Sequence, residues 1–183
     1  MKKLILSAVM VAGLAVTSFG QGTINFANYE NTDTSTSATT SGLIFDASEN
    51  LLTVETINAE LLGGSASGSL TSLLTITDGN FYYSGVPGAY LDLNGTESVV
   101  TGVAKQGIGY FMVRVWLGSD TDWASAVSNG AVRGSSAEFQ NSTGGDIPAP
   151  TLTGMGAIVL VPEPSSLALV GLAAAFLAIR RRK

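Results

Sequence analysis

The clearest structural signal in the sequence is the stretch IGYFMVRVWL at residues 108–117. Large apolar residues recur there at every second position, which is the period of a strand with one face in a core. The residues predicted to face the core are Phe111, Val113, Val115 and Leu117. The opposite face is amphipathic and either lines a groove or covers apolar surface with long side chains. Its residues are Tyr110, Met112, Arg114 and Trp116.

Several short apolar segments precede this strand. Residues 21–28 and residues 51–57 alternate apolar with polar side chains, so each predicts a strand. Asp78-Gly79-Asn80 separates the apolar runs 70–77 and 81–83, and Asp-Gly in such a position indicates a hairpin turn. Other expected elements, in chain order, are a small-residue loop at 31–42, turns at 61–69 and 85–88, a strand at 89–93 and a short strand opening at 99–100.

The segments that follow the strand predict one helix and a final strand. Residues 123–128 have alanine-rich spacing after Asp120-Thr121-Asp122, which predicts a two-turn helix capped by Asp or Thr. Asn129-Gly130 would end that helix. Residues 132–145 read as loop, and the β-branched run 157–161 predicts a last core strand. Many short strands separated by turns favour an all-β fold, a single β-sandwich or jelly roll over residues 21–161.

The composition of residues 21–161 limits the functions of this domain. About 140 residues suffice for one domain with its own core. Thirteen acidic residues stand against three basic ones, Lys105, Arg114 and Arg133, which gives a net charge of −10. Such a surface repels phosphate backbones, so nucleic acid is not an expected partner.

The sequence contains no cysteine and no histidine. Disulfides, histidine general bases and Ser-His-Asp triads are therefore excluded, and zinc and copper sites are not expected. We predict a protein that is not an enzyme and that uses no cofactor.

The first twenty residues have the order of a secretory signal peptide. Lys2 and Lys3 precede an apolar run at residues 4–16, and Ser18 and Gly20 supply a small-x-small cleavage pattern. This order predicts export through the secretion translocon and cleavage between Gly20 and Gln21, which makes residues 1–20 a removable segment.

The last residues predict a membrane helix. Residues 167–179 (LALVGLAAAFLAI) carry no polar side chain, and a helix that is apolar on every face must be buried in protein or lipid. The basic end consists of Arg180, Arg181, Arg182 and Lys183. Four cations there favour a span of the inner membrane with this end in the cytoplasm, although the apolar run is short for a bilayer. The preceding chain would then lie outside the cytoplasm.

Pro162-Glu163-Pro164, followed by this span and basic end, resembles the PEP-CTERM sorting signal of Gram-negative bacteria. The resemblance covers residues 162–183. It implies recognition by an exosortase, a transpeptidase-like membrane protease thought to cleave near the motif. It also implies delivery to the cell surface or the extracellular matrix, often alongside exopolysaccharide production.

Scattered blocks of the central domain are similar to uncharacterised secreted PEP-CTERM proteins. These blocks are QGTINFAN from residue 21, VRVW, DWASAV, the Gly-Ala-Val-Arg-Gly loop, Thr143-Gly144-Gly145 and VLVPEP. The similarity implies a β-rich domain and no particular chemistry.

Three groups of residues are candidates for chemistry. Asp120 and Asp122 offer calcium ligands, but helix capping explains them more simply. Paired carboxylates such as Glu49/Glu55 or Asp92/Glu97 could serve a glycosidase, although thirteen scattered acids make some pair inevitable. Aromatic residues could form a platform for polysaccharide, with core packing as the simpler role. They are Tyr82, Tyr83, Tyr90, Tyr110, Trp116 and Trp123.

The sequence thus predicts an exported surface or matrix protein, anchored at first in the inner membrane. Its alternatives are a carboxylate-dependent glycoside hydrolase and a calcium-stabilised adhesin. Two N-glycosylation sequons, Asn94-Gly95-Thr96 and Asn141-Ser142-Thr143, read as chance occurrences.

Overall fold

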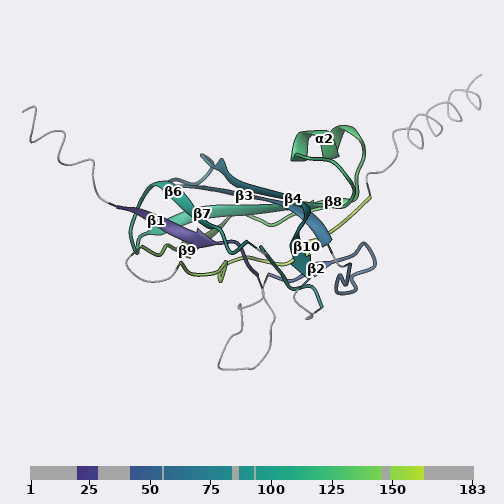
Figure 1. Cartoon of the computed structure of the whole chain (residues 1–183), viewed down its shortest axis with the longest axis horizontal. Coiled ribbons are helices and arrows are strands. Elements are labelled where there is room, and N and C mark those ends of the chain that lie inside the picture. The colour runs from purple at the N-terminus through teal and green to yellow at the C-terminus, as the bar shows by residue number, and fades with distance from the viewer. Residues whose placement is uncertain are drawn as a thin grey trace, which may run out of the picture.

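The computed structural model describes residues 20–28, 42–54, 56–83, 87–92, 94–145 and 149–162. These residues form ten strands and one short helix (Figure 1). The elements are β1 (Gln21–Asn25), β2 (Ile44–Phe45), β3 (Thr56–Gly64), β4 (Thr71–Tyr83), β5 (Tyr90–Asp92), β6 (Glu97–Ala104), β7 (Ile108–Trp116), α2 (Trp123–Ser128), β8 (Arg133–Ser135), β9 (Phe139–Ser142) and β10 (Ile158–Val159). The predicted all-β class is confirmed.

The largest sheet has six strands in the order β5-β4-β3-β7-β8, with β9 also paired to β7. One edge of β7 runs antiparallel to β3, from Asn58 opposite Trp116 to Gly64 opposite Tyr110. Its other edge is shared, because β9 pairs with the first half of β7 and β8 with the second half. The strand predicted at residues 108–117 therefore exists and lies inside the sheet.

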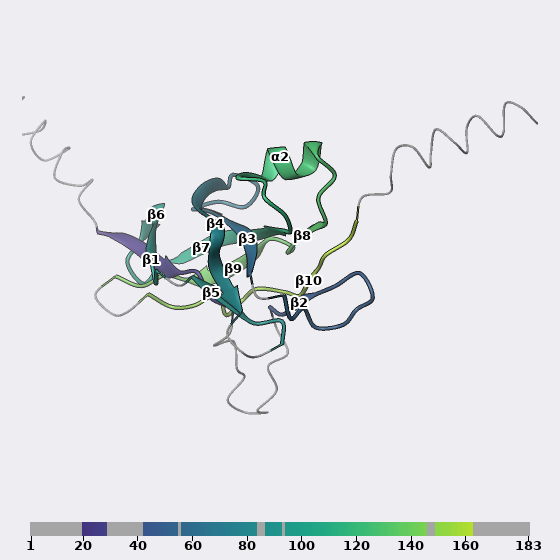
Figure 2. The same ribbon diagram turned by 45° about the vertical axis from the view of Figure 1, so that its right-hand side comes forward.

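Two small sheets complete the fold. β1 pairs antiparallel with β6, and β2 pairs parallel with β10. The two sheets lie toward opposite ends of the molecule in both ribbon views (Figures 1 and 2). Ile24 of β1, Val100 of β6, Ile44 of β2 and Ile158 of β10 join one core cluster with the inner face of the large sheet. One core therefore holds all three sheets together.

The inner face of β7 supplies the centre of this core. Phe111, Val113 and Val115 are buried, as the alternation predicted, and Leu117 lies partly buried just beyond the strand. The Phe111 ring packs 6.0 Å from the Phe139 ring. Burial of these side chains removes apolar area from water, which is the main favourable contribution to folding.

The strand predicted at residues 51–57 is wrong, and the turn predicted at 61–69 is confirmed only for the part after Gly64. β3 instead runs from Thr56 to Gly64, and the chain turns only after Gly64. Gly63 and Gly64 are typical of turns, but both lie in the strand. Each has a neighbour so close that a residue with a side chain would not fit there. A Cβ on Gly63 would collide with Leu73 and Phe111, and one on Gly64 with the Ser69 carbonyl.

The hairpin predicted at Asp78-Gly79-Asn80 is also wrong. β4 continues through these residues as one strand of 13 residues. Its register against β3 jumps from Phe81 opposite Ile57 to Ile76 opposite Ala59, so the intervening residues form a bulge. The Asn80 side-chain amide donates to the Thr77 carbonyl at 3.1 Å across this bulge. Glycine permits a bulge as readily as a turn.

Most of the other predicted elements are confirmed, and one predicted loop is wrong in part. Helix α2 and strands β1, β5 and β10 lie inside their predicted segments, and β6 extends the short strand expected at 99–100. The loop predicted at 132–145 is wrong in part, because β8 and β9 lie within it and complete the free edge of β7.

Several predicted features lie outside the residues that the structure describes. They are the signal peptide up to residue 19, the loop 31–42 except Gly42, Glu163, Pro164, the membrane helix 167–179 and the basic end 180–183. Within the described part of the chain, no helix combines the length and the hydropathy that a membrane span requires.

Candidate functional site

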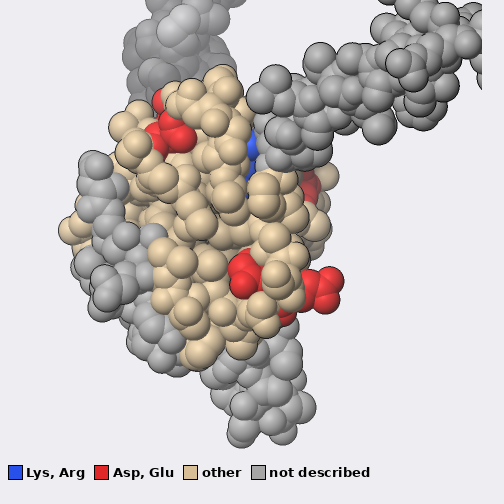
Figure 3. All heavy atoms as spheres, turned by 90° about the vertical axis from the view of Figure 1, so that its right-hand side faces the viewer, with Lys and Arg blue, Asp and Glu red and all other residues tan. Residues whose placement is uncertain are grey.

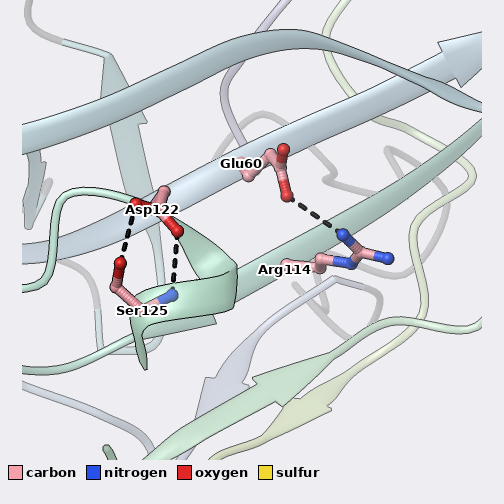
Figure 4. A network of polar contacts seen from close by, with 4 residues as sticks. All are labelled: Glu60, Arg114, Asp122 and Ser125. Atoms are coloured by element: carbon pink, nitrogen blue, oxygen red, sulfur yellow. Dashed lines mark hydrogen bonds and ion pairs between the residues drawn. The ribbon is translucent and has the colours of Figure 1, made fainter. Parts of the chain in front are cut away.

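The outer face of the central strands carries a partly buried ion pair. Glu60 of β3 stands opposite Arg114 of β7, and the Arg114 Nη1 donates to the Glu60 Oε2 at 3.2 Å (Figure 4). The Arg114 side chain is 31% exposed and the Glu60 side chain is 14% exposed. An ion pair reached by this much water contributes at most about 1 kcal/mol to stability, so its value lies more in positioning Arg114.

Trp116 lies on the same outer face but is fully buried. Its indole N–H donates to the Asp120 carbonyl at 2.8 Å, and the Trp123 ring meets it edge-on at 6.1 Å. The segment after β7 thus folds back and places α2 over this end of the strand. Core packing, the simpler role predicted for Trp116, is therefore confirmed, because the returning chain supplies both cover and a hydrogen-bond acceptor.

Two arginines converge on Trp123. The guanidinium carbon of Arg114 lies 5.4 Å and that of Arg133 lies 5.8 Å from the centre of the Trp123 rings. Both distances allow a cation–π attraction. Glu60, Arg114, Trp116, Trp123 and Arg133 are hereafter called the Trp123 cluster.

A shallow hollow of about 200 Å³ borders this cluster. It is lined by Leu62, Gly68, Leu70, Met112, Arg114 and Glu138. Apolar side chains therefore stand beside one cation and one carboxylate, and Arg114 belongs to both the hollow and the cluster.

Glu138 serves as an acceptor in this hollow. Its Oε2 accepts from the Gly68 N–H at 3.0 Å. Hydrogen bonds from the Ser67 side chain and the Gly68 backbone lower the pKa of Glu138 below its ordinary value, because they favour the charged form. At neutral pH the group is a carboxylate that accepts hydrogen bonds and holds no proton to donate.

Of the two acids before α2, Asp122 caps the helix, as predicted, whereas Asp120 bonds a side chain at its far end. Asp122 accepts from the backbone N–H and the hydroxyl of Ser125, both at 2.8 Å (Figure 4). Asp120 accepts from the Asn129 side chain. These bonds from Ser125 lower the pKa of Asp122 from its ordinary value of 3.8. Among the residues described, no group of three or more acidic, histidine or cysteine side chains is placed to hold a metal ion.

Replacing Asp122 by alanine should lower the melting temperature by a few degrees at pH 7, because α2 loses its cap. A lowered pKa means that the cap contributes stability above the ordinary pKa and loses it as the pH falls through the folded-state value. The difference from the unmodified protein should therefore be smaller at about pH 2. Thermal melts of both at the two pH values check this.

Asp122→Asn is the matched control, since asparagine caps as well as aspartate. It should melt close to the unmodified protein at pH 7. A full loss in Asp122→Asn equal to that in Asp122→Ala would show that charge, and not capping geometry, matters.

The carboxylate pairs suggested by the sequence are not assembled into a site. Asp92 is buried and its two oxygens accept from the backbone N–H groups of Asn94 and Thr96. Glu97 is exposed at the start of β6, Glu49 is exposed in a turn, and Glu55 lies outside the described ranges. On the face shown in Figure 3, acidic side chains fall in separate groups, one near the top and one lower down.

The aromatic residues do not gather on one platform. Tyr90 is fully buried, and its hydroxyl donates to the Val54 carbonyl at 2.7 Å. Tyr110 is half-buried on the outer face of β7, and the side chains of Tyr82 and Tyr83 are outside the described set. Core packing accounts for Tyr90 and Trp116, and within the described residues Trp123 is the aromatic side chain on which cationic groups lie.

The sequence analysis singled out Arg114, Trp116 and Trp123 separately and missed the roles of Arg133, Glu60 and Glu138. The available signal was the scarcity of basic residues, since two of the three in residues 21–161 meet at Trp123. Their meeting depends on the pairing of β7 with β8, which local patterns do not reveal.

The residues predicted to mark the two processing sites lie at the borders of the folded body. Gly20 is exposed, its carbonyl accepts from the Lys105 N–H at 3.1 Å, and Gln21 begins β1. At the other end Val161 pairs with Arg133, and Pro162 is exposed directly after it.

Comparison with known proteins yields one finding. The family model of the PEP-CTERM protein-sorting motif matches residues 160–183. No curated protein and no solved structure matches the chain. The chain therefore carries a PEP-CTERM sorting motif, as the sequence predicted, and this motif supports exosortase-dependent sorting of an exported protein, with an exosortase as the processing partner.

Proposed function

We propose that the body at residues 21–161 is a non-enzymatic protein of the cell surface or extracellular matrix that binds polysaccharide beside the Trp123 cluster. The signal peptide is removed between Gly20 and Gln21. The helix at 167–179, with cytoplasmic residues 180–183, holds the chain in the inner membrane until the exosortase acts. The body is a β-sandwich, in which the two small sheets cover the core face of the large one, and it needs no cofactor.

The observation that carries this proposal is the gathering of basic residues at Trp123. The body has a net charge of −10 and three cations, and two of these cations lie against the Trp123 ring. This concentration of scarce positive charge indicates that the region around the ring has a role. The cation–π contacts and the Glu60 ion pair orient Arg114 toward the neighbouring hollow.

The hollow has the chemistry of a sugar site. Arg114 donates hydrogen bonds and Glu138 accepts them, which matches hydroxyl groups that do both. Leu62 and Met112 offer an apolar wall for the C–H face of a ring. A volume of about 200 Å³ is below the 300 Å³ or so of an ordinary small-molecule pocket, so the site suits one ring of a polymer.

The charge balance selects a neutral or weakly charged polysaccharide. The acidic body repels a strongly anionic polymer over about one Debye length, roughly 8 Å at physiological ionic strength. The low pKa of Glu138 favours binding over glycoside hydrolysis, because a general acid needs a raised pKa.

The double variant Arg114→Met with Glu60→Gln should weaken polysaccharide binding about tenfold or more, equivalent to about 1.4 kcal/mol. Changing both members avoids leaving an unpaired, partly buried charge. Mobility of the purified body in gels that contain the exopolysaccharide of its own bacterium measures the binding.

The matched control is Lys105→Met with Glu97→Gln, which also removes one cation and one carboxylate, both exposed. It should bind as the unmodified body does. Equal retardation of all three proteins, or none of any of them, would refute the proposed binding.

A further inference from the structure

Strand β10 is built into the core of the body. Ile158 and Leu160 are 0% and 1% exposed, and both belong to the main core cluster. The Ile158 N–H donates to the Leu43 carbonyl at 3.0 Å, and the Leu160 N–H donates to the Phe45 carbonyl at 2.8 Å. The chain just before the sorting motif is therefore an anchored strand.

The pairing continues to the last residue before the motif. Val161 donates to the Arg133 carbonyl at 3.0 Å and accepts from the Arg133 N–H at 3.2 Å. Pro162 follows at once and is exposed. No spacer separates the folded body from Pro162-Glu163-Pro164.

Close contact with β8 reinforces this anchoring. A Cβ on Gly134 would collide with the Val159 carbonyl and with the Ile158 side chain. Glycine at this position lets the two strands lie against each other, so even a methyl group would push β10 away.

Anchored backbone is a poor substrate for a protease. Cleavage concentrates where the chain is exposed and lacks hydrogen-bond partners, and a bond inside a packed strand is cut only from a locally opened state. Opening β10 would expose Ile158 and Leu160 and break its ladder, so the opened state is rare.

We infer that docking of β10 sets the upstream limit of processing, so that the exosortase cuts a peptide bond C-terminal to Val161. The inference rests on the processing proposed above. When the peptide bond breaks, the acyl carbon of the body bonds to a nucleophile, and the nitrogen leaves as the new amino terminus of the tail peptide. Water as nucleophile leaves a carboxylate on the body, and an amine leaves a new amide. The body departs with β10 in place and its core closed.

The test is mass spectrometry of the C-terminal peptides of the released body, made from the full chain in its own bacterium. Released chains should all end at Val161 or beyond it. Ends before Val161 in the unmodified protein would overturn the inference while leaving the proposed processing intact. Recovery of uncut chain alone would instead contradict the processing, and the inference with it.

Gly134→Ala tests the mechanism, because it loosens β10 without touching the motif. It should add chains that end upstream of Val161. Gly156→Ala is the matched control, since a Cβ there meets nothing within 4 Å, and its ends should be unchanged. Ile158→Ala weakens the anchor by a second route outside residues 160–183, and unchanged ends in both Gly134→Ala and Ile158→Ala would show that docking sets no limit.

Discussion

Replacing Pro162, Glu163 and Pro164 together by alanine should abolish release. The chain should lose only its signal peptide, keep its C-terminal tail and stay in the membrane. The sorting motif at residues 160–183 contains these three residues. The apolar run 167–179 and the basic end would then hold the uncut chain in the inner membrane. Fractionation of cells, followed by immunoblotting of membrane and medium, measures the change from release to retention.

A control must separate loss of the motif from loss of two prolines. The body contains its own Pro-Ala-Pro at residues 148–150, so Pro148→Ala with Pro150→Ala removes two prolines and leaves the motif intact. That variant should be processed normally. Normal processing of the triple-alanine chain would refute the role of the motif.

The second large effect is expected in the core. Phe111→Ala should destabilise the body by about 3–5 kcal/mol, a large part of the roughly 5–15 kcal/mol that holds a domain together. Cβ atoms added at Gly63 and Gly109 would touch the Phe111 ring, so the ring lies between two glycines that cannot fill the space it leaves. Thermal unfolding should shift down by about 10 °C or more.

Ile108→Ala on the same strand is the control, because Ile108 is 57% exposed. It should change the melting temperature little. If Phe111→Ala melted like Ile108→Ala, the assignment of the inner face of β7 would be wrong.

The elements that the sequence predicted well are those with local causes. The inner face of β7 follows from strict alternation, and α2 follows from its Asp122 cap and its stop at Asn129. The sorting tail was equally predictable, because motif, apolar run and basic end are contiguous.

The errors arose where distant neighbours decide the structure. Gly63 is a strand residue because Phe111 and Leu73 approach it, and Asp78-Gly79-Asn80 bulges because β4 keeps its pairing with β3 on both sides. The segment that covers Trp116 on its way to α2 likewise leaves no periodic signal in the sequence.

Only part of the candidate site could be predicted from the sequence. Arg114 and Trp123 were singled out, but Arg133 joins them through the pairing of β7 with β8, and Glu60 through its register against β7. Such cross-strand contacts depend on register, which a single sequence does not encode locally.

The most direct test of the account is the intact mass of the protein recovered from fractionated cells. The account predicts a surface or extracellular species that begins at Gln21 and lacks the apolar run 167–179. A chain of all 183 residues recovered from the cytosol would contradict it.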